Sequence, residues 1–522
     1  MLQELVSPAS LGLALTAALL LMIWRAFFTR VSSIPGPLIA RFSDLWYAYR
    51  IFRGEFEKDN IELHRKYGPV VRYGPKRFSI DEPEAANLIY GLGSRLTKSS
   101  WYQTWTSPSP QAWNLFSDQD AKRHSSNRRQ YQNTYSMSSL VHYEPYVDEC
   151  ADLLCQRLSE MGARNSLAWS QPVNMGHWLQ CYAFDVIGLI TYSKRIGFLD
   201  HGEDVGDVMR NLGDHLAYAS VVGVYPWLHP ILFRLRNWLA GSRGTGRQYI
   251  INFTQERMAT HQAEPKAEPV SEQAGTRAGV AQQQKPETMD FLSRFLQKHS
   301  ENPSTFTPYH VLMGCVSNMV AGSDTTSISL SAILYHVLRN PNVLNRLRDE
   351  VDQNCPQNKT ASPHISFAQS QAMPYLQAVI KEALRVHPAT GLPLERVVPE
   401  GGLTIAEVFF PQGSIVGINS WVAHSNRTIF GDDADIFNPE RWLCGDTERL
   451  STMNRHWMPF GLGSRNCIGR HISMLEMCKL VPRLIRDFEF QLCDEREWQI
   501  RNHWFVKPGN LRMLVRPRVA QG

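Results

Sequence analysis

A single thiol in a glycine-rich stretch is the feature of this chain most able to do chemistry. Residues 460–469 read Phe-Gly-Leu-Gly-Ser-Arg-Asn-Cys-Ile-Gly, so Cys467 lies between Gly463 and Gly469 and close to the fixed positive charge of Arg465. Glycines let the backbone adopt conformations that other residues avoid and let it approach a flat ligand closely. We expect backbone N–H groups and the arginine to lower the pKa of the thiol. This arrangement suits a thiolate that binds a metal.

Two simpler interpretations of Cys467 compete with this one. A lone cysteine is most often a small buried hydrophobic residue. A zinc site with His471 would need a second pair of ligands at zinc spacing, which the sequence lacks. The fixed offsets that join Phe460 and the glycines to the cysteine and to Arg465 favour a site that binds iron.

These offsets resemble the Phe-x-x-Gly-x-Arg-x-Cys-x-Gly signature of the cytochrome P-450 superfamily, the haem-thiolate monooxygenases, and match it at every specified position. The resemblance implies a mainly α-helical fold with small β-sheets. It also implies haem b as the cofactor and Cys467 as the axial iron ligand, whose thiolate favours O–O cleavage. A looser likeness, in residues 93–98 and 114–117, is to the filamentous-fungal branch that includes pisatin demethylase. That likeness implies a bulky apolar substrate in secondary metabolism.

A long helix is expected to begin at Pro308, with Thr307 as its cap, and to end near Asn340, which precedes a proline. Its middle, residues 321–326, reads Ala-Gly-Ser-Asp-Thr-Thr, and most of these residues form helices poorly. The residues alone therefore leave a loop between two helices as an equal alternative.

The resemblance favours one continuous helix that passes over the haem. It implies that Asp324 and Thr325 supply an acid and an alcohol for proton delivery. It also implies that Gly322 leaves room for dioxygen.

Another predicted helix, residues 376–386, carries Glu382 and Arg385, which share a face because they are three residues apart. Taken alone, they would form an ordinary surface ion pair of small energetic value. The P-450 pattern Glu-x-x-Arg, followed by a Pro-Glu-Arg segment that contains Arg441, implies a buried cluster instead. We expect these three residues to brace the cysteine loop and to take no part in catalysis.

Four cationic side chains are candidates for binding the haem propionates, since buried carboxylates are costly unless they are paired. His124 and Arg128 are four residues apart on one predicted helix and resemble the family's His-x-x-x-Arg element. Arg396 follows the Glu-x-x-Arg helix, and Arg465 lies in the cysteine loop. The alternative for His124 is a surface position on a basic helix.

The chain has 522 residues, 43% of them hydrophobic, which is enough to bury a large core. The resemblance implies that residues 31–522 form one monooxygenase domain. Residues 262–287 are rich in Ala, Gln, Glu, Pro and Lys, and they are typical of a flexible internal linker. The net charge of +5 gives no case for nucleic acid, because no nucleic-acid motif accompanies it.

Residues 5–24 carry no charge and are long enough to cross a bilayer. A cleaved signal peptide would need a basic leader and a small-residue cleavage site, so a transmembrane anchor is the favoured interpretation. Glu4 precedes this segment, whereas Arg25 and Arg30 follow it, which places the body on the cytosolic side. We expect a single-pass protein of the endoplasmic reticulum membrane.

The expected reaction inserts one atom of O₂ into a hydrophobic small molecule. No flavin, nicotinamide or iron–sulfur motif is recognisable in the sequence, so electrons must come from a partner. The resemblance implies an NADPH-cytochrome reductase, a flavoprotein of the same membrane. Lys122, Arg123, Arg129 and Arg470 are candidates for its docking surface, or they form an ordinary solvated face.

By analogy with the family, several side chains are placed around the substrate: Trp101, Tyr102, Val316, Ala321, Leu392, Leu394, Trp504 and Phe505. Ordinary core packing is the simpler role for each aromatic member. Two other functions are alternatives. A haem-thiolate isomerase or dehydratase acting on a peroxide would need neither a reductase nor Asp324 and Thr325. A haem sensor or electron carrier would have no use for a glycine and a threonine over the iron.

Overall fold

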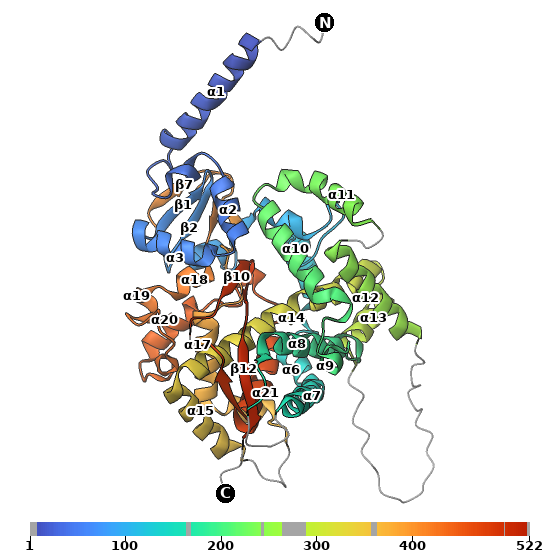
Figure 1. The fold of residues 1–522 in the computed structure, drawn as a ribbon. Helices are drawn as coiled ribbons and strands as arrows, with labels where there is room; N and C mark the ends of the chain where they lie inside the picture. Colours follow the sequence, from blue (N-terminus) through green and yellow to red (C-terminus); the bar gives the residue numbers. More distant parts are fainter. Residues whose placement is uncertain are drawn as a thin grey trace, which may run out of the picture.

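The computed structural model describes residues 8–162, 169–241, 245–263, 289–356, 363–494 and 496–518. It consists mainly of helices, with small sheets beside them (Figure 1). The longer α-helices are α1 (Pro8–Phe27), α3 (Phe56–Tyr67), α5 (Ala121–Gln132), α7 (Glu144–Met161), α8 (Met175–Tyr192), α10 (Val208–Val222), α11 (His229–Ala240), α12 (Gly246–Ala263), α13 (Phe291–Glu301), α14 (Pro308–Arg339), α15 (Pro341–Asn354), α17 (Pro374–Val386) and α21 (Arg470–Asp487). The shorter ones are α2 (Leu45–Arg53), α4 (Ala85–Tyr90), α6 (Met137–Leu140), α9 (Phe198–His201), α16 (Phe367–Gln371), α18 (Ser420–His424), α19 (Arg427–Phe430) and α20 (Thr447–His456).

Helix α14 runs through the middle of the body and packs against α8, α13, α17 and α21 (Figure 1). The predicted cap is present: the side chain of Thr307 accepts from the backbone of His310, and the His310 side chain in turn accepts from the backbone of Thr307. The helix ends before Asn340, as expected. It stays helical through residues 321–326, so the alternative of a loop there is wrong. Packing on several sides outweighs the weak local propensity of this segment.

Within the described residues, the strands form four small sheets. Their bounds are β1 (Val70–Gly74), β2 (Arg77–Ile80), β3 (Thr97–Lys98), β4 (Val173–Asn174), β5 (Arg396–Val397), β6 (Leu403–Ile405), β7 (Val408–Phe410), β8 (Ile415–Gly417), β9 (Phe488–Leu492), β10 (Ile500–His503), β11 (Phe505–Pro508) and β12 (Arg512–Pro517). The largest has the order β1-β2-β8-β5-β3, with β2 and β8 parallel. A second has the order β4-β12-β9, and β6–β7 and β10–β11 are two-stranded. Because β3 pairs with β5, two segments far apart in sequence lie side by side.

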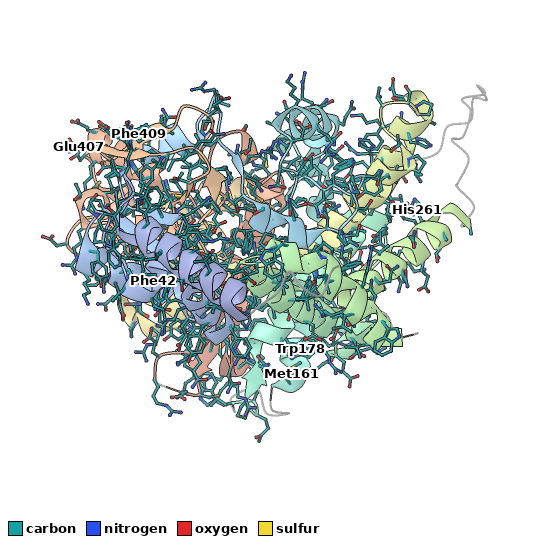
Figure 2. All side chains as sticks on the ribbon, turned by 90° about the horizontal axis from the view of Figure 1, so that it is seen from above. Phe42, Met161, Trp178, His261, Glu407 and Phe409 are labelled. Atoms are coloured by element: carbon teal, nitrogen blue, oxygen red, sulfur yellow. The ribbon has the colours of Figure 1, made fainter. Side chains whose placement is uncertain are left out.

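Helix α1 projects away from the body (Figure 1). The C-terminal end of α1 contacts the body. Phe27 packs against Phe42, which is labelled in Figure 2, with ring centroids 5.7 Å apart. The guanidinium of Arg41 also donates to the carbonyls of Ala26 and Ser32. Residues 5–7 of the predicted anchor lie outside the described residues. In the described ranges, no helix combines the length and the apolar character that a membrane crossing requires.

The predicted linker, residues 262–287, lies outside the described residues except for its first two residues, which end α12. His261, labelled in Figure 2, lies just before this point. Its Nε2 atom is 3.0 Å from the hydroxyl of Ser293 on α13, so α12 is joined to the helix that follows.

Candidate functional site

The cysteine loop is closed by a backbone hydrogen bond from the N–H of Cys467 to the carbonyl of Phe460, at 2.7 Å. Gly463 has φ +63°, and a Cβ atom there would lie 1.7 Å from the carbonyl oxygen of Tyr90. Both the left-handed backbone and the close approach therefore require glycine. Gly469 is different, because its φ of −84° is open to any residue and its N–H bonds to the sulfur.

Burial affects the pKa of the Cys467 thiol more than the neighbouring groups do. Burial raises its pKa above the usual value, against the lowering effect of the N–H groups of Gly469 and Arg470 and of the charges of Arg128 and Arg470. The expected net lowering is thus wrong for the metal-free thiol. The sequence predicted that Arg465 lies beside the thiol. In the structure its guanidinium donates to the carbonyl of Asp118 at 2.8 Å. Arg128, on α5, instead donates to the carbonyl of Asn466 at 2.8 Å.

The exposure of Cys467 and of the middle of α14 bears on where a ligand could lie. Cys467 is exposed although burial dominates its titration. Ala321 is exposed in the middle of α14, where Met319 and Ser323 are buried. Thr325, one turn after Ala321, is partly exposed. Cys467 and the part of α14 around Ala321 and Thr325 are therefore accessible to a ligand.

The acid and the alcohol predicted on α14 lie side by side in sequence but have different surroundings. The hydroxyl of Thr325, a partly exposed residue, donates to the carbonyl of Ala321 at 2.7 Å. Asp324 is completely buried, and its carboxylate meets Gln180 and Lys507. Gly322 does not serve the predicted purpose of leaving room for dioxygen, because a Cβ there would point at Ile187, 3.1 Å away. This glycine instead lets α14 approach α8.

The four predicted propionate partners gather in one place, and a fifth cationic side chain joins them. They are Lys98, His124, Arg128, Arg396 and Arg465. Burial, followed by the charges of the arginines and the lysine, lowers the pKa of His124 to about 3. Burial, followed by Arg396, lowers the pKa of Arg465 to about 10. His124 is thus neutral, but Lys98 and Arg396 are buried and Arg128 and Arg465 are partly buried, so repulsion among these four cations is costly. A dianion placed among them would relieve it.

The reasoning from sequence missed Lys98 as a member of this group. Lys98 is buried and lies directly opposite Arg396 in the pairing of β3 with β5. Burial, and then the charge of Arg396, lowers its pKa well below the usual value. Its Nζ donates to the carbonyl of Phe116 and lies 4.2 Å from the ring centroid of Tyr102. No local signal marks this lysine, because its partner is brought to it only by strand pairing.

These observations fit the haem that the resemblance implies. Cys467 is exposed, and a group of basic side chains lies beside it, one of which, Arg128, acts on the sulfur. Asp118, a carboxylate that acts on Lys98 and Arg465, is already paired with Arg123 at 2.8 Å. A planar ligand with two carboxylates would neutralise the excess charge.

The Glu-x-x-Arg pair on α17 is buried, so it is not an ordinary surface ion pair. A carboxylate oxygen of Glu382 lies 2.8 Å from the guanidinium of Arg385 and 2.9 Å from that of Arg441. Trp442 also donates to Glu382, at 2.9 Å. Arg385 donates to the carbonyl of His424 at 2.7 Å, which carries the network toward the cysteine loop.

Three of the aromatic residues predicted over the substrate, Trp101, Tyr102 and Trp504, form one cluster with two that were not predicted, Trp105 and Phe116. The ring centroids of Trp101 and Trp504 are 5.0 Å apart, and those of Tyr102 and Phe116 are 5.3 Å apart. Trp105 packs against Phe116 at 5.1 Å. Of the remaining predicted lining residues, Leu392 and Phe505 are buried, whereas Val316 and Leu394 are partly buried. The cluster joins the segment before α5 to the hairpin of β10 and β11.

Comparison with known proteins agrees with this geometry. The sequence profile of the family described as Cytochrome P-450 matches residues 34–515. Pisatin demethylase of Fusarium vanettenii is 36% identical over 501 residues, which cover 96% of this chain and 91% of that protein. A cytochrome P-450 monooxygenase of Aspergillus terreus is also 36% identical, with 88% and 91% covered. The cytochrome P-450 monooxygenase cicH of Emericella nidulans is 35% identical, with 94% and 95% covered.

Proposed function

This chain belongs to the cytochrome P-450 family, and from that premise we propose that Cys467 binds the iron of haem b in a monooxygenase of fungal secondary metabolism. The family binds haem b through a cysteine thiolate and incorporates oxygen from O₂. The observation that carries the assignment to this residue is the exposed Cys467 beside a group of basic side chains, one of which, Arg128, acts on its sulfur. The proposed substrate is a hydrophobic small molecule.

When bound, haem supplies the activation of dioxygen and the transfer of one oxygen atom to the substrate. The chain does the rest. Cys467 would hold the iron, and the N–H groups of Gly469 and Arg470 would support the negative charge of its thiolate. Lys98, His124, Arg396 and Arg465 would bind the propionates, with Arg128 supporting the loop through Asn466.

Thr325 and Asp324 are the proposed residues of proton delivery. Thr325 is partly exposed and lies one turn from the exposed Ala321, so its hydroxyl can hold a water molecule and pass a proton. Asp324 is the nearby acid, and it must leave its buried partners to act. The aromatic cluster of Trp101, Tyr102 and Trp504 would exclude water and orient an apolar substrate.

Electrons are proposed to come from an NADPH-cytochrome reductase, since members of the family depend on a redox partner. Lys122, Arg129 and Arg470 are exposed on α5 and at the start of α21, the two helices that flank the cysteine loop. Arg123 is less available because it is paired with Asp118. A positive surface close to the iron ligand would attract an acidic partner.

A membrane location in the endoplasmic reticulum, with residues 5–24 as a single-pass anchor and the body in the cytosol, is part of the proposal. Apolar side chains along α1 are exposed, including Leu20 at 61% and Trp24 at 54%. A second exposed apolar face on and before α11 includes Trp227, Ile231 and Trp238. Both surfaces suit contact with lipid. A version that lacks residues 1–30 tests the anchor: it should leave the membrane fraction at least partly and still bind haem.

The experiment that tests the function uses the purified holoenzyme and its Cys467→Ala variant. The parent protein, reduced in the presence of carbon monoxide, should give the band characteristic of a thiolate ligand, and the variant should lose it. Metabolites of a deletion strain and its parent then identify candidate substrates. With reductase, NADPH and ¹⁸O₂, one labelled oxygen atom should enter the product. Turnover of a hydroperoxide without reductase and without label would support an isomerase or dehydratase instead.

A further inference from the structure

A second group of basic side chains lines a pocket between α10, α11 and α12, the three helices that lie together in Figure 1. The residues that carry the argument are His215 and Tyr218 on α10, Phe233 and Arg236 on α11, Arg247 on α12, and Thr104 in the segment before α5. None of the described residues that line this pocket is acidic. The pocket thus gathers positive charge without a carboxylate to balance it.

The two arginines of the pocket lack polar partners. In the ranges that the structure describes, neither guanidinium forms a hydrogen bond or a salt bridge with another residue. Arg236 lies over the ring of Tyr218, with its guanidinium carbon 4.2 Å from the ring centroid. Arg247 is partly buried, and burial lowers its pKa. Because a partly buried guanidinium is costly without an acceptor, an anionic ligand would stabilise it.

His215 adds a buried polar group to the same pocket. Its side chain is 8% exposed, and among the described residues its ring nitrogens have no hydrogen-bond partner. Burial, followed by the charges of Arg247 and Arg236, lowers the pKa of this ring to about 3, so it is neutral. A neutral imidazole keeps one N–H group that can donate. Since both arginines act on this ring, the three side chains serve one pocket.

Trp105 connects this pocket to the aromatic cluster. Its ring centroid lies 5.9 Å from that of His215 and 6.0 Å from that of Trp504. An apolar molecule that lies against the cluster can therefore extend one end into the pocket. The free space among the lining side chains is small, so it suits a single group such as a carboxylate and not a whole substrate.

We propose that Arg236, Arg247 and His215 bind the carboxylate of the substrate, which makes the substrate an apolar acid; this deepens, and rests on, the proposed monooxygenase function. Arginine forms two parallel hydrogen bonds with a carboxylate, which fixes the orientation of a ligand and adds to its affinity. With its carboxylate held here, the apolar part of the substrate would lie toward Trp105 and the aromatic cluster.

The first experiment measures binding and does not depend on turnover. Equilibrium dialysis of the ferric, full-length holoenzyme compares biphenylacetate with biphenylacetamide, which differ only in the charged group. The parent should bind the acid about tenfold more tightly, because a charged hydrogen bond contributes roughly that factor. Arg236→Met and Arg247→Met should each remove most of this preference by weakening the acid and leaving the amide unchanged. Arg247→Lys keeps the charge and should retain part of it.

A matched control and a stability measurement accompany these variants. Arg234→Met removes an exposed arginine of α11 that does not line the pocket, and it should keep the preference of the parent. Because Arg236 and Arg247 lack polar partners in the ligand-free protein, their methionine variants should not melt below the parent. A lower melting temperature in both, with an unchanged preference for the acid, would show that these arginines serve packing and would overturn the proposal.

The second experiment uses the natural substrate. The metabolite that accumulates in a deletion strain should carry a carboxylate, and its methyl ester should have a KM about tenfold higher with the parent enzyme but not with Arg247→Met. A neutral metabolite that the enzyme oxygenates would overturn the inference and leave the monooxygenase function standing. If no labelled oxygen enters any product while the preference for biphenylacetate is intact, the proposed function fails instead.

Two further arms distinguish other sources of the anion. If inorganic phosphate at the concentration of the probe removes the preference for biphenylacetate, the pocket binds small anions in general. If phosphatidylserine added to phosphatidylcholine nanodiscs removes it, the pocket binds lipid headgroups. Either result would overturn the assignment to the substrate, as would equal binding of the acid and the amide by the parent.

Discussion

Nε2 of His424 accepts a hydrogen bond from the backbone N–H of Met458 at 2.9 Å, while its Nδ1 donates to the carbonyl of Arg385 at the same distance. Because the donor of the first bond is the backbone N–H of Met458, Nε2 accepts and carries no proton. The imidazole ring is therefore neutral. Burial, followed by the charge of Arg385, lowers the pKa of His424 to about 3, which keeps it so. One imidazole thus joins the buried Glu382 cluster to the segment that enters the cysteine loop.

Replacing His424 with alanine should loosen that segment. The N–H of Met458 and the carbonyl of Arg385 would each lose a buried partner, at a cost of about 1–3 kcal/mol per group. We expect a lower melting temperature of the holoenzyme and a smaller fraction of reduced protein with the thiolate–carbon monoxide band. His201→Ala, at an exposed histidine, is the control. If His424→Ala keeps the melting temperature and the thiolate–carbon monoxide band of the parent, the hydrogen bonds of His424 do not stabilise the cysteine loop.

Arg385→Ala should give apoprotein or aggregate and not a folded enzyme with slow turnover. It leaves the carboxylate of Glu382 buried beside fewer cations, which costs about 3–5 kcal/mol, a large share of the stability of a typical domain. Arg427→Ala removes an exposed arginine paired with Asp435 and should cost less than about 1 kcal/mol. Haem content and thermal unfolding of the two variants provide the comparison. A soluble, haem-loaded Arg385→Ala of normal stability would contradict the bracing role.

Lys98→Met should have opposite effects on the two forms of the protein. Removing a lysine whose charge is disfavoured by burial and by Arg396 should not destabilise the haem-free protein. Haem should be lost more readily, because a charged hydrogen bond contributes about 1.5–3 kcal/mol, or roughly tenfold or more in the rate of loss. Transfer of haem to an acceptor protein measures this rate, with Lys98→Arg as the control. Equal haem retention in all three proteins would exclude Lys98 from propionate binding.

Glu57→Gln should stabilise the protein at alkaline pH. Burial raises the pKa of Glu57 from 4.5 to about 7, although Asn502 donates to its carboxylate. The folded state thus holds a proton that the unfolded state releases, so the parent loses stability as the pH rises from about 4.5 through about 7. Glutamine has no such proton. The free energy of unfolding should favour the variant by up to about 3 kcal/mol at about pH 8, and this advantage should shrink toward about pH 5.

A chemical denaturation series at several pH values measures this difference. Glu400→Gln, at an exposed glutamate, should show no comparable trend with pH. A difference between Glu57→Gln and the parent that does not change with pH would show that the carboxyl of Glu57 titrates normally.

Thr325→Ala should still bind haem and substrate but lose coupling. NADPH consumption should continue while product falls and hydrogen peroxide rises, because the reduced oxygen escapes before the proton arrives. Ser323→Ala is the matched control, since this buried hydroxyl forms the same type of bond to its own helix, at 2.9 Å to Met319. If both variants form the same amount of product per NADPH consumed, Thr325 has no part in the proposed proton delivery.

The local patterns of this chain could be interpreted without a structure. The offsets around Cys467 predicted the family, and the Thr307 cap with Pro308 predicted where α14 begins. The spacing of Glu382 and Arg385 predicted that they share a face. Each of these patterns depends on residues within a few positions of one another, where backbone geometry sets the distances whatever the rest of the fold does.

Only the tertiary structure decided which separate segments meet. Lys98 joins the cationic group because β3 pairs with β5, and Lys507 reaches Asp324 because the β10–β11 hairpin packs against α14. The direction of Gly322 toward Ile187 and the net rise in the pKa of Cys467 likewise depend on what packs around them. Burial and charge act over distances in space, and distant parts of the chain become neighbours only when the core forms.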